Sequence, residues 1–306
     1  MLEANPNYHM GEPAIKTLIY KVIPESSSRV AMLKDGTIDV AYALSPSELT
    51  ALKGAPGVKV IQLRSNEACW GLLNNTIPPF DNKLVRQAFN YAIPKAEICE
   101  TAYLGMADPW QACIPSIYPD STPPEEFPYS YDLDKAKELL VEAGYPDGFE
   151  VDLAYDTGIK AYEVAATLIK TSLAEIGVNV TLRGMPTGTI TTKVQAGEMP
   201  FALWTDQPMM GDPMYSITLT YYSTSFINYE KYLNPEVDRL VDEGVGILDP
   251  EKRYEYYAAV QRIIMDDAPI IFAWEPHYTV AIRDNIKGWN WNTMQDTKFE
   301  LVYFAQ

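Results

Sequence analysis

The chain has 306 residues, of which 47% are hydrophobic and 21% charged, the composition of a globular protein with a substantial core. Its 41 acidic residues outnumber 24 basic ones, which gives a formal net charge of −17. Nucleic acids and anionic membranes bind proteins through clustered cations, so this balance argues against both as partners. We also expect no membrane-spanning helix and no signal peptide, because no long apolar run occurs and the first 13 residues lack basic and apolar regions.

The first 63 residues are predicted to form strands around one helix. The strands cover residues 16–23, 38–43 and 58–63. The helix carries Val30 and Leu33 and ends at Gly36, where glycine favours the left-handed cap. Strand, helix and strand joined by short connections predict a parallel crossover.

The central part predicts alternating helices and strands. Asp81 is expected to cap a helix, Pro94 to begin the next as its first residue, and Asp132 to cap another. Strands follow at 149–155, 178–182 and 201–204, with helices at 161–176 and 190–196 between them. This order predicts an α/β sheet with mostly parallel strands.

The last third predicts two helices and a buried strand. Asn234-Pro235 and Asp249-Pro250 each combine a cap residue with proline in the first helical turn. A strand is expected at 270–274, and weak alternation follows from Val280. Residues 109–128 contain six prolines and show no periodicity, which is typical of an ordered surface loop.

The sequence shows no signature of catalysis or metal binding. It lacks the nucleophile elbow, the phosphate-binding loop and the zinc-protease motif. Cys69, Cys99 and Cys113 have no metal-type spacing, and buried free thiols are the simplest interpretation. His277 follows Glu275 closely and could join a metal site, although a surface histidine is the simpler reading.

One segment is a candidate ligand site. It follows the predicted strand 201–204, and ligands bind at the carboxyl ends of parallel strands. The segment offers an indole, a hydroxyl, two carboxylates and two thioethers, and its candidate residues are Trp204, Thr205, Asp206, Met209, Met210 and Asp212. A carboxylate here could pair with a ligand ammonium group. A plain acidic turn is the alternative.

Several ordered motifs resemble family 5 of the bacterial extracellular solute-binding proteins, the dipeptide, oligopeptide and nickel binders of ABC importers. The matching stretches are Ala4-Asn5-Pro6-Asn7-Tyr8 with Gly11-Glu12-Pro13, residues 33–40, Asn74-Asn75-Thr76 with Pro79-Phe80-Asp81, residues 85–93, residues 131–145 with Gly148-Phe149, residues 232–238, and Arg253 with Tyr257. The matches extend over nearly the whole chain.

The resemblance implies an α/β fold of the periplasmic-binding-protein kind, class II and type C, whose two lobes close on a ligand. Family members are longer, and the matching part is their C-terminal two-thirds. We therefore expect residues 1–75 and 273–306 to form part of lobe I, and residues 76–272 to form lobe II. The implied location is the periplasm or a lipid anchor at the cell surface.

The implied function is to capture a peptide and deliver it to the membrane permease, without catalysis, cofactor or metal. In peptide-binding relatives an aspartate shortly after a tryptophan holds the ligand's ammonium group. It usually lies three residues further on, whereas Asp206 lies two residues after Trp204. A nickel chelate, sugar or opine-like ligand is the alternative, and an interaction module or enzyme is a more distant one. An incomplete lobe I would expose strand edges, which favours dimers.

Overall fold

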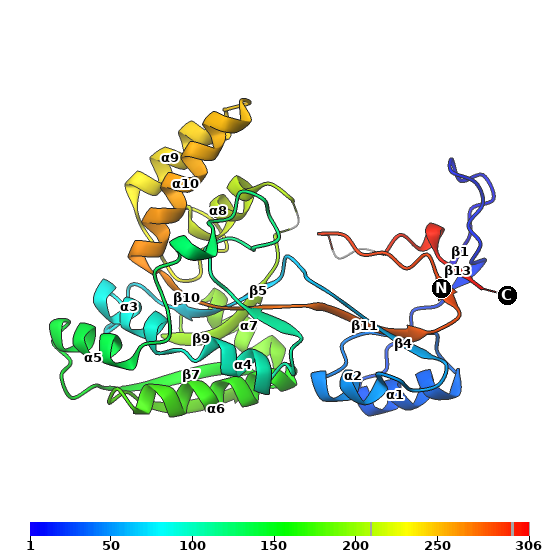
Figure 1. Ribbon diagram of the computed structural model, residues 1–306, viewed down its shortest axis with the longest axis horizontal. Coiled ribbons are helices and arrows are strands. Elements are labelled where there is room, and N and C mark those ends of the chain that lie inside the picture. The colour runs from blue at the N-terminus through cyan, green and yellow to red at the C-terminus, as the bar shows by residue number, and fades with distance from the viewer. Residues whose placement is uncertain (209, 295–296, 306) are drawn as a thin grey trace. The chain divides into compact units, whose positions relative to one another are not determined.

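A computed structural model describes residues 1–208, 210–294 and 297–305. The chain folds into two compact units, and each is described by itself (Figure 1). Unit 1 combines Met1–Leu63 with His277–Gln306, and unit 2 is Arg64–Pro276. These limits differ by several residues from the predicted lobe boundaries, and the assignment of lobes stays a prediction.

Unit 1 is built on a small antiparallel sheet. Its strands are β3 (Val40–Ala41), β11 (Tyr278–Arg283) and β4 (Val58–Leu63), in that order, and β11 is antiparallel to both neighbours. The unit also contains helices α1 (Ser26–Asp35) and α2 (Pro46–Leu52) and the short pairs β1 (Leu2–Glu3) with β2 (Thr17–Leu18) and β12 (Ile286–Lys287) with β13 (Tyr303–Phe304). A 3₁₀ turn, η2, covers Phe299–Leu301.

The predicted crossover from residues 16–23 to residues 38–43 is wrong. Of that first stretch only Thr17 and Leu18 are assigned to a strand, and they pair with β1 rather than β3. Ile19, Tyr20 and Val22 remain 64 to 92% exposed, so the β-rich composition here reflects no buried strand. Helix α2 was not predicted, although Ser45 and Glu48 form a reciprocal capping box at its start.

Unit 2 is built on a six-stranded sheet in the order β6-β10-β5-β9-β7-β8. The bounds are β5 (Ala68–Leu73), β6 (Ala107–Pro109), β7 (Glu150–Asp156), β8 (Asn179–Met185), β9 (Phe201–Asp206) and β10 (Ile270–Pro276). In the described part of the chain, β7 pairs in parallel with β8 and β9, whereas the pairs β5–β9, β5–β10 and β6–β10 are antiparallel. The three strands on which the parallel prediction rested, β7, β8 and β9, are parallel to one another as expected. The sheet as a whole is mixed, because β5 and β6 run in the opposite direction.

Helices cover both faces of this sheet. Their bounds are α3 (Lys83–Ala92), α4 (Lys95–Thr101), α5 (Leu133–Glu142), α6 (Lys160–Ala174), α7 (Thr187–Gln195), α8 (Pro213–Tyr221), α9 (Pro235–Val245) and α10 (Pro250–Asp267), with a 3₁₀ turn, η1, at Pro124–Glu126. Helices α3 to α6 bury their apolar faces in one core, and α7 to α10 contribute to the other (Figure 1). We call these the α6-side and the α10-side of the sheet.

Local capping chemistry sets most helix starts. Asp132, Asn234 and Asp249 accept backbone N–H groups at the starts of α5, α9 and α10, as predicted. The predicted starts of two other helices are each wrong by one residue. Asn82, not Asp81, caps α3, and Pro94 precedes α4 as its cap instead of being its first residue.

Strand β5 was not predicted, although it lies inside the sheet. All six of its residues are buried, so it lacks the alternation of polar and apolar residues that marks a strand with one wet face. Gly71 has a packing role here, because a Cβ at this position would lie 2.6 Å from the Cδ1 atom of Ile271 on β10.

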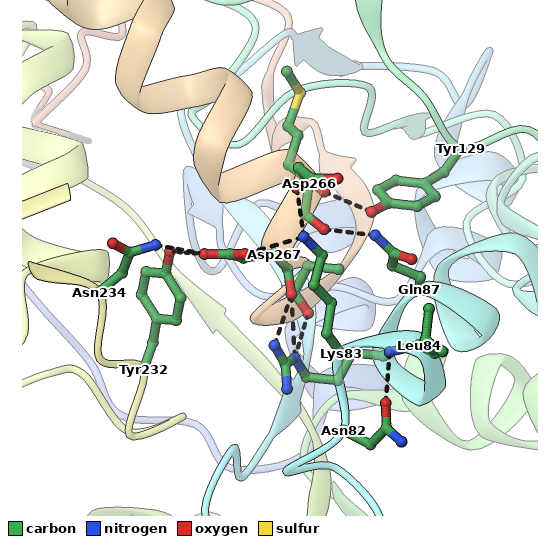
Figure 2. Close-up of polar contacts among 12 residues, drawn as sticks. Asn82, Lys83, Leu84, Gln87, Tyr129, Tyr232, Asn234, Asp266 and Asp267 are labelled. Atoms are coloured by element: carbon green, nitrogen blue, oxygen red, sulfur yellow. Dashed lines mark hydrogen bonds and ion pairs between the residues drawn. The ribbon is translucent and has the colours of Figure 1, made fainter. Parts of the chain in front are cut away.

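A polar network closes the C-terminal end of α10, where four backbone carbonyls have no partner inside the helix (Figure 2). The hydroxyl of Tyr129 donates to Met265 O at 2.5 Å, and the Gln87 amide donates to Asp266 O at 2.7 Å. The buried guanidinium of Arg86 donates to Asp267 O at 2.8 Å and to Ala268 O at 3.1 Å. Two side chains of α3, together with Tyr129 from the loop before α5, thereby fix the point where α10 turns into β10.

The side chain of Asp267 joins this network to the segment before α9. Its Oδ2 atom accepts from the Tyr232 hydroxyl at 2.6 Å and from the Asn234 amide at 2.7 Å (Figure 2). Lys83 on α3 pairs with both Asp266 and Asp267. Residues of the motifs 85–93 and 232–238 therefore stabilise the place where α3, α9 and α10 meet.

The three cysteines are free and buried. Cys69 and Cys99 lie in the α6-side core, whereas Cys113 lies in the α10-side core. Burial raises the pKa of each thiol, in the case of Cys99 to about 12. Among the described residues, no helix is both long enough and apolar enough to cross a membrane.

Candidate ligand-binding site

The candidate site lies at the carboxyl end of β9, on the α10-side of the sheet. The register of β9 against β5 places Trp204 opposite Trp70 and Asp206 opposite Ala68. Because side chains alternate along a strand, Trp204 and Asp206 point to the same face as these partners. Trp204 also packs edge-on against Tyr229, with 5.6 Å between the ring centroids.

Thr205 and Asp206 belong to β9, because the strand runs two residues beyond its predicted end. Thr205 lies opposite Cys69, whose side chain belongs to the α6-side core. Its hydroxyl donates toward the Glu67 carboxylate at 3.0 Å and toward Ala68 O at 3.2 Å. The structure thus brings Trp204 and Asp206 together and turns Thr205 to the other face.

Asp206 is a half-buried carboxylate. Its Oδ1 atom accepts from the backbone N–H of Gln207 at 2.7 Å. Burial raises the pKa of Asp206 above its ordinary value, and the Gln207 hydrogen bond lowers it by less. An added cation would offset this burial, so the position favours a positively charged ligand group.

Asp212 lies where α8 begins and already receives several donors. Its Oδ1 atom accepts from Met214 N at 2.8 Å and from the Tyr257 hydroxyl at 3.1 Å. The Arg253 guanidinium lies 3.4 Å from Oδ2. The aspartate therefore caps α8 and fastens it to α10, and a role in ligand binding stays a prediction.

The predicted site also includes two methionines, Met209 and Met210. Met210 is 56% exposed, and its backbone carbonyl accepts from the Tyr118 hydroxyl at 3.1 Å. Met209 lies outside the described residues. The carbonyl of Pro208 accepts from the Asn66 amide at 2.5 Å, so Asn66 and Tyr118 hold the two sides of this loop.

A cavity of about 20 Å³ lies beside Asp206, and we call it the Asp206 cavity. Its walls include Trp70, Trp110, Ser216, Tyr221 and Ile227, none of which was predicted. They come from β5, α8 and two loops, so no short stretch of sequence groups them. The proline-rich segment 109–128 was the available signal, since it supplies Trp110, Cys113 and Pro115.

Segment 109–128 is ordered, as predicted, but it is not a surface loop, because much of it, including Trp110 and Tyr118, is buried. Side chains of β10, α10 and α4 hold it in place. The buried Glu275 carboxylate accepts from both the backbone N–H and the hydroxyl of Ser116, and burial raises the pKa of Glu275 to about 6. Gln261 accepts from Thr122 N at 2.9 Å. The Lys95 ammonium lies 4.6 Å from the Phe127 ring centroid, and burial lowers the pKa of Lys95 to about 7.

The structure gives no support for a metal site at His277. Its Nδ1 atom lies 2.9 Å from the side-chain amide of Gln62. No group of three or more histidine, cysteine, aspartate or glutamate side chains that could hold a metal ion was found in the described parts of the chain.

An α/β unit with an aromatic cavity next to a half-buried carboxylate has the features of a protein that binds small solutes. The family model described as "Bacterial extracellular solute-binding proteins, family 5 Middle" matches residues 1–228. The chain belongs to this family, as its motifs predicted. The predicted α/β fold of the periplasmic-binding-protein kind is likewise confirmed by solved structures.

Two curated relatives illustrate the match. Heme-binding protein A of Haemophilus influenzae is 30% identical over 275 residues, which cover 88% of this chain and 50% of that protein. Glutathione-binding protein GsiB of Escherichia coli is 27% identical, with 94% of this chain and 57% of that protein covered. The chain thus spans about half the length of the curated relatives it matches.

Solved structures agree over nearly the whole chain. The periplasmic binding protein DppA of Helicobacter pylori, in complex with the peptide STSA, superposes with a TM-score of 0.88 at 26% identity, covering 99% of this chain and 61% of that one. CtaP of Listeria monocytogenes gives a TM-score of 0.90 at 23% identity, covering 99% of this chain and 63% of that one, and shows the fold alone.

Proposed function

We propose that this chain is the substrate-binding component of an ABC importer and captures peptides by their free α-ammonium group. The ammonium group pairs with the Asp206 carboxylate, and the neighbouring indole of Trp204 shields the pair from water. The protein acts by binding and release, without catalysis, and hands its ligand to the membrane permease. It does so outside the cytoplasm, in the periplasm or attached to the cell surface by a lipid.

The setting of Asp206 carries this proposal. Its carboxylate is half-buried, accepts the backbone N–H of Gln207 at 2.7 Å, and is disfavoured by burial in its charged form. A ligand ammonium group supplies both a charge and three N–H donors. Membership of the solute-binding family supports the same conclusion, as do relatives whose names include a glutathione binder and a complex with a tetrapeptide.

The proposal takes residues 1–75 and 273–306 as part of lobe I and residues 76–272 as lobe II. It includes self-association through unit 1, whose exposed surface carries Ile19, Tyr20 and Val22. These apolar side chains are 67, 64 and 92% exposed, and exposed apolar surface favours contact with another protein surface. Light scattering of the purified chain tests the dimer.

Asp206→Asn is expected to weaken the binding of an unmodified tripeptide such as Ala-Ala-Ala by roughly 10- to 100-fold. The reason is that a hydrogen bond to a charged group contributes about 1.5–3 kcal/mol. Isothermal titration calorimetry measures the affinity. Acetylation of the peptide's N-terminus should cause a loss of similar size in the wild type and little further loss in the variant.

Asp134→Asn is the matched control, because it removes the same charge from an exposed position on α5. It should leave the affinity unchanged. The proposal is contradicted if acetylation or Asp206→Asn has no effect on binding. Titration with hemin and with glutathione in the same series tells whether another ligand of the relatives is preferred.

A further inference from the structure

The Asp206 cavity is small and closed in by aromatic side chains. Its open volume of about 20 Å³ is enough for one water molecule or one methyl group. Trp70, Trp110 and Tyr221 form aromatic walls, and Asp206 lies at the same cavity. Any group that the carboxylate binds therefore places its next atoms beside these walls.

The aromatic walls are fixed in place. Trp110 is 2% exposed, and its indole N–H donates to Ile114 O at 3.0 Å. Tyr221 is 1% exposed, and its hydroxyl donates to Cys113 O at 2.9 Å. Enlarging the cavity would break these hydrogen bonds or displace packed rings, and forcing extra atoms into a packed site is costly.

Two polar side chains at the cavity have unmet hydrogen-bonding capacity. Within the described residues, the Trp70 Nε1 atom and the Ser216 Oγ atom are buried and have no hydrogen-bond partner. Buried polar groups of this kind commonly receive a partner from water or from a ligand. The cavity therefore suits a small group, including one that carries a hydroxyl.

We propose that the Asp206 cavity receives the side chain of the ligand's first residue and selects glycine, alanine or serine over larger residues. This inference rests on the proposed function, in which Asp206 holds the ammonium group of that same residue. The α-carbon is bonded directly to the ammonium nitrogen, so the first side chain starts within reach of the cavity. The remaining residues of the peptide are not subject to this restriction.

A peptide series tests the selection. Ala-Ala-Ala, Ser-Ala-Ala, Leu-Ala-Ala and Phe-Ala-Ala differ in the first side chain alone, and calorimetry gives the affinity of each. The peptides that begin with alanine or serine should bind at least roughly ten-fold more tightly than the peptide that begins with phenylalanine, because overpacking a site costs about 1–3 kcal/mol. The peptide that begins with leucine should lose affinity to a similar extent.

Ile227→Ala removes part of the cavity wall and should reduce the disadvantage of the leucine peptide several-fold. Ile176→Ala is its matched control, since Ile176 is as well buried but belongs to the α6-side core. It should leave the order of the four affinities unchanged. Leu219→Ala, at another wall position, replaces Ile227→Ala if that variant does not fold.

The outcomes separate this inference from the proposed function. Equal affinity for all four peptides, with binding still dependent on Asp206, overturns the size selection and leaves peptide capture standing. Unchanged discrimination in the folded Ile227→Ala or Leu219→Ala variant overturns it as well. Loss of the dependence on Asp206 or on the free ammonium group overturns the proposed function itself.

Discussion

Arg86→Met is expected to lower the free energy of unfolding of unit 2 by about 4 kcal/mol, since a buried acceptor left without its donor costs about 1–3 kcal/mol. The side chain is 6% exposed, and it donates to Phe80 O at 2.8 Å as well as to the carbonyls of Asp267 and Ala268. Methionine fills similar space but donates nothing. Urea unfolding followed by tryptophan fluorescence measures the loss.

Arg239→Met gives a matched comparison on the surface. Arg239 is about half exposed on α9 and pairs with Glu236 and Glu243, and exposed ion pairs contribute about 0–1 kcal/mol. The same chemical change should therefore cost far less there. Equal losses in the two variants would show that the carbonyls at the end of α10 do not depend on Arg86.

Glu230→Gln is expected to stabilise the protein increasingly as the pH rises. Glu230 is fully buried, and in the described part of the chain neither carboxylate oxygen has a hydrogen-bond partner. Burial raises the pKa of Glu230 from 4.5 to about 8. Glutamine has the same shape and does not ionise, so it never has to carry a buried charge.

The direction of this pH dependence follows from the protons that the folded and the unfolded chain bind. Between pH 4.5 and about 8 the unfolded chain has lost the Glu230 proton, whereas the folded chain retains it. Stability of the wild type therefore falls with rising pH, by up to about 1.4 kcal/mol per pH unit from this group. The difference between variant and wild type should grow over this range and then become constant.

Thermal or urea unfolding at pH 5, 6, 7 and 8 measures this difference. Glu236→Gln serves as the control, because hydrogen bonds from Arg239 lower the pKa of this exposed carboxyl. Glu236 is largely ionised in both states from pH 5 to 8, so its variant should show only a small slope, of the opposite sign, near pH 5. A pH-independent difference for Glu230→Gln would mean that the carboxyl finds a partner or water in solution.

Short-range chemistry explains which parts of the fold could be predicted from sequence. Asp132, Asn234 and Asp249 cap helices through donors two or three residues away, so the signal lies within one turn. Strand direction is set by distant partners instead. The mixed sheet arises because β5 runs antiparallel to both of its neighbours, β9 and β10, and the composition of β5 does not specify these neighbours.

The residues of the candidate site could likewise be predicted from the sequence only in part. Trp204 and Asp206 were predicted from their place after a strand, and the structure places them on one face. Thr205 was grouped with them because the strand was expected to end at 204, whereas alternation through β9 directs it to the opposite face. Trp70, Trp110 and Tyr221 reach the cavity only through the tertiary fold.

The burial of the three thiols has a practical consequence. Thiol reagents attack the exposed thiolate, and each of these groups is shielded and held in its protonated form by a raised pKa. Disulfide links between copies are disfavoured for the same reason while the chain stays folded. The rate of alkylation therefore reports how fast the core opens. Cys69 and Cys99 report on the α6-side of the sheet, and Cys113 reports on the α10-side.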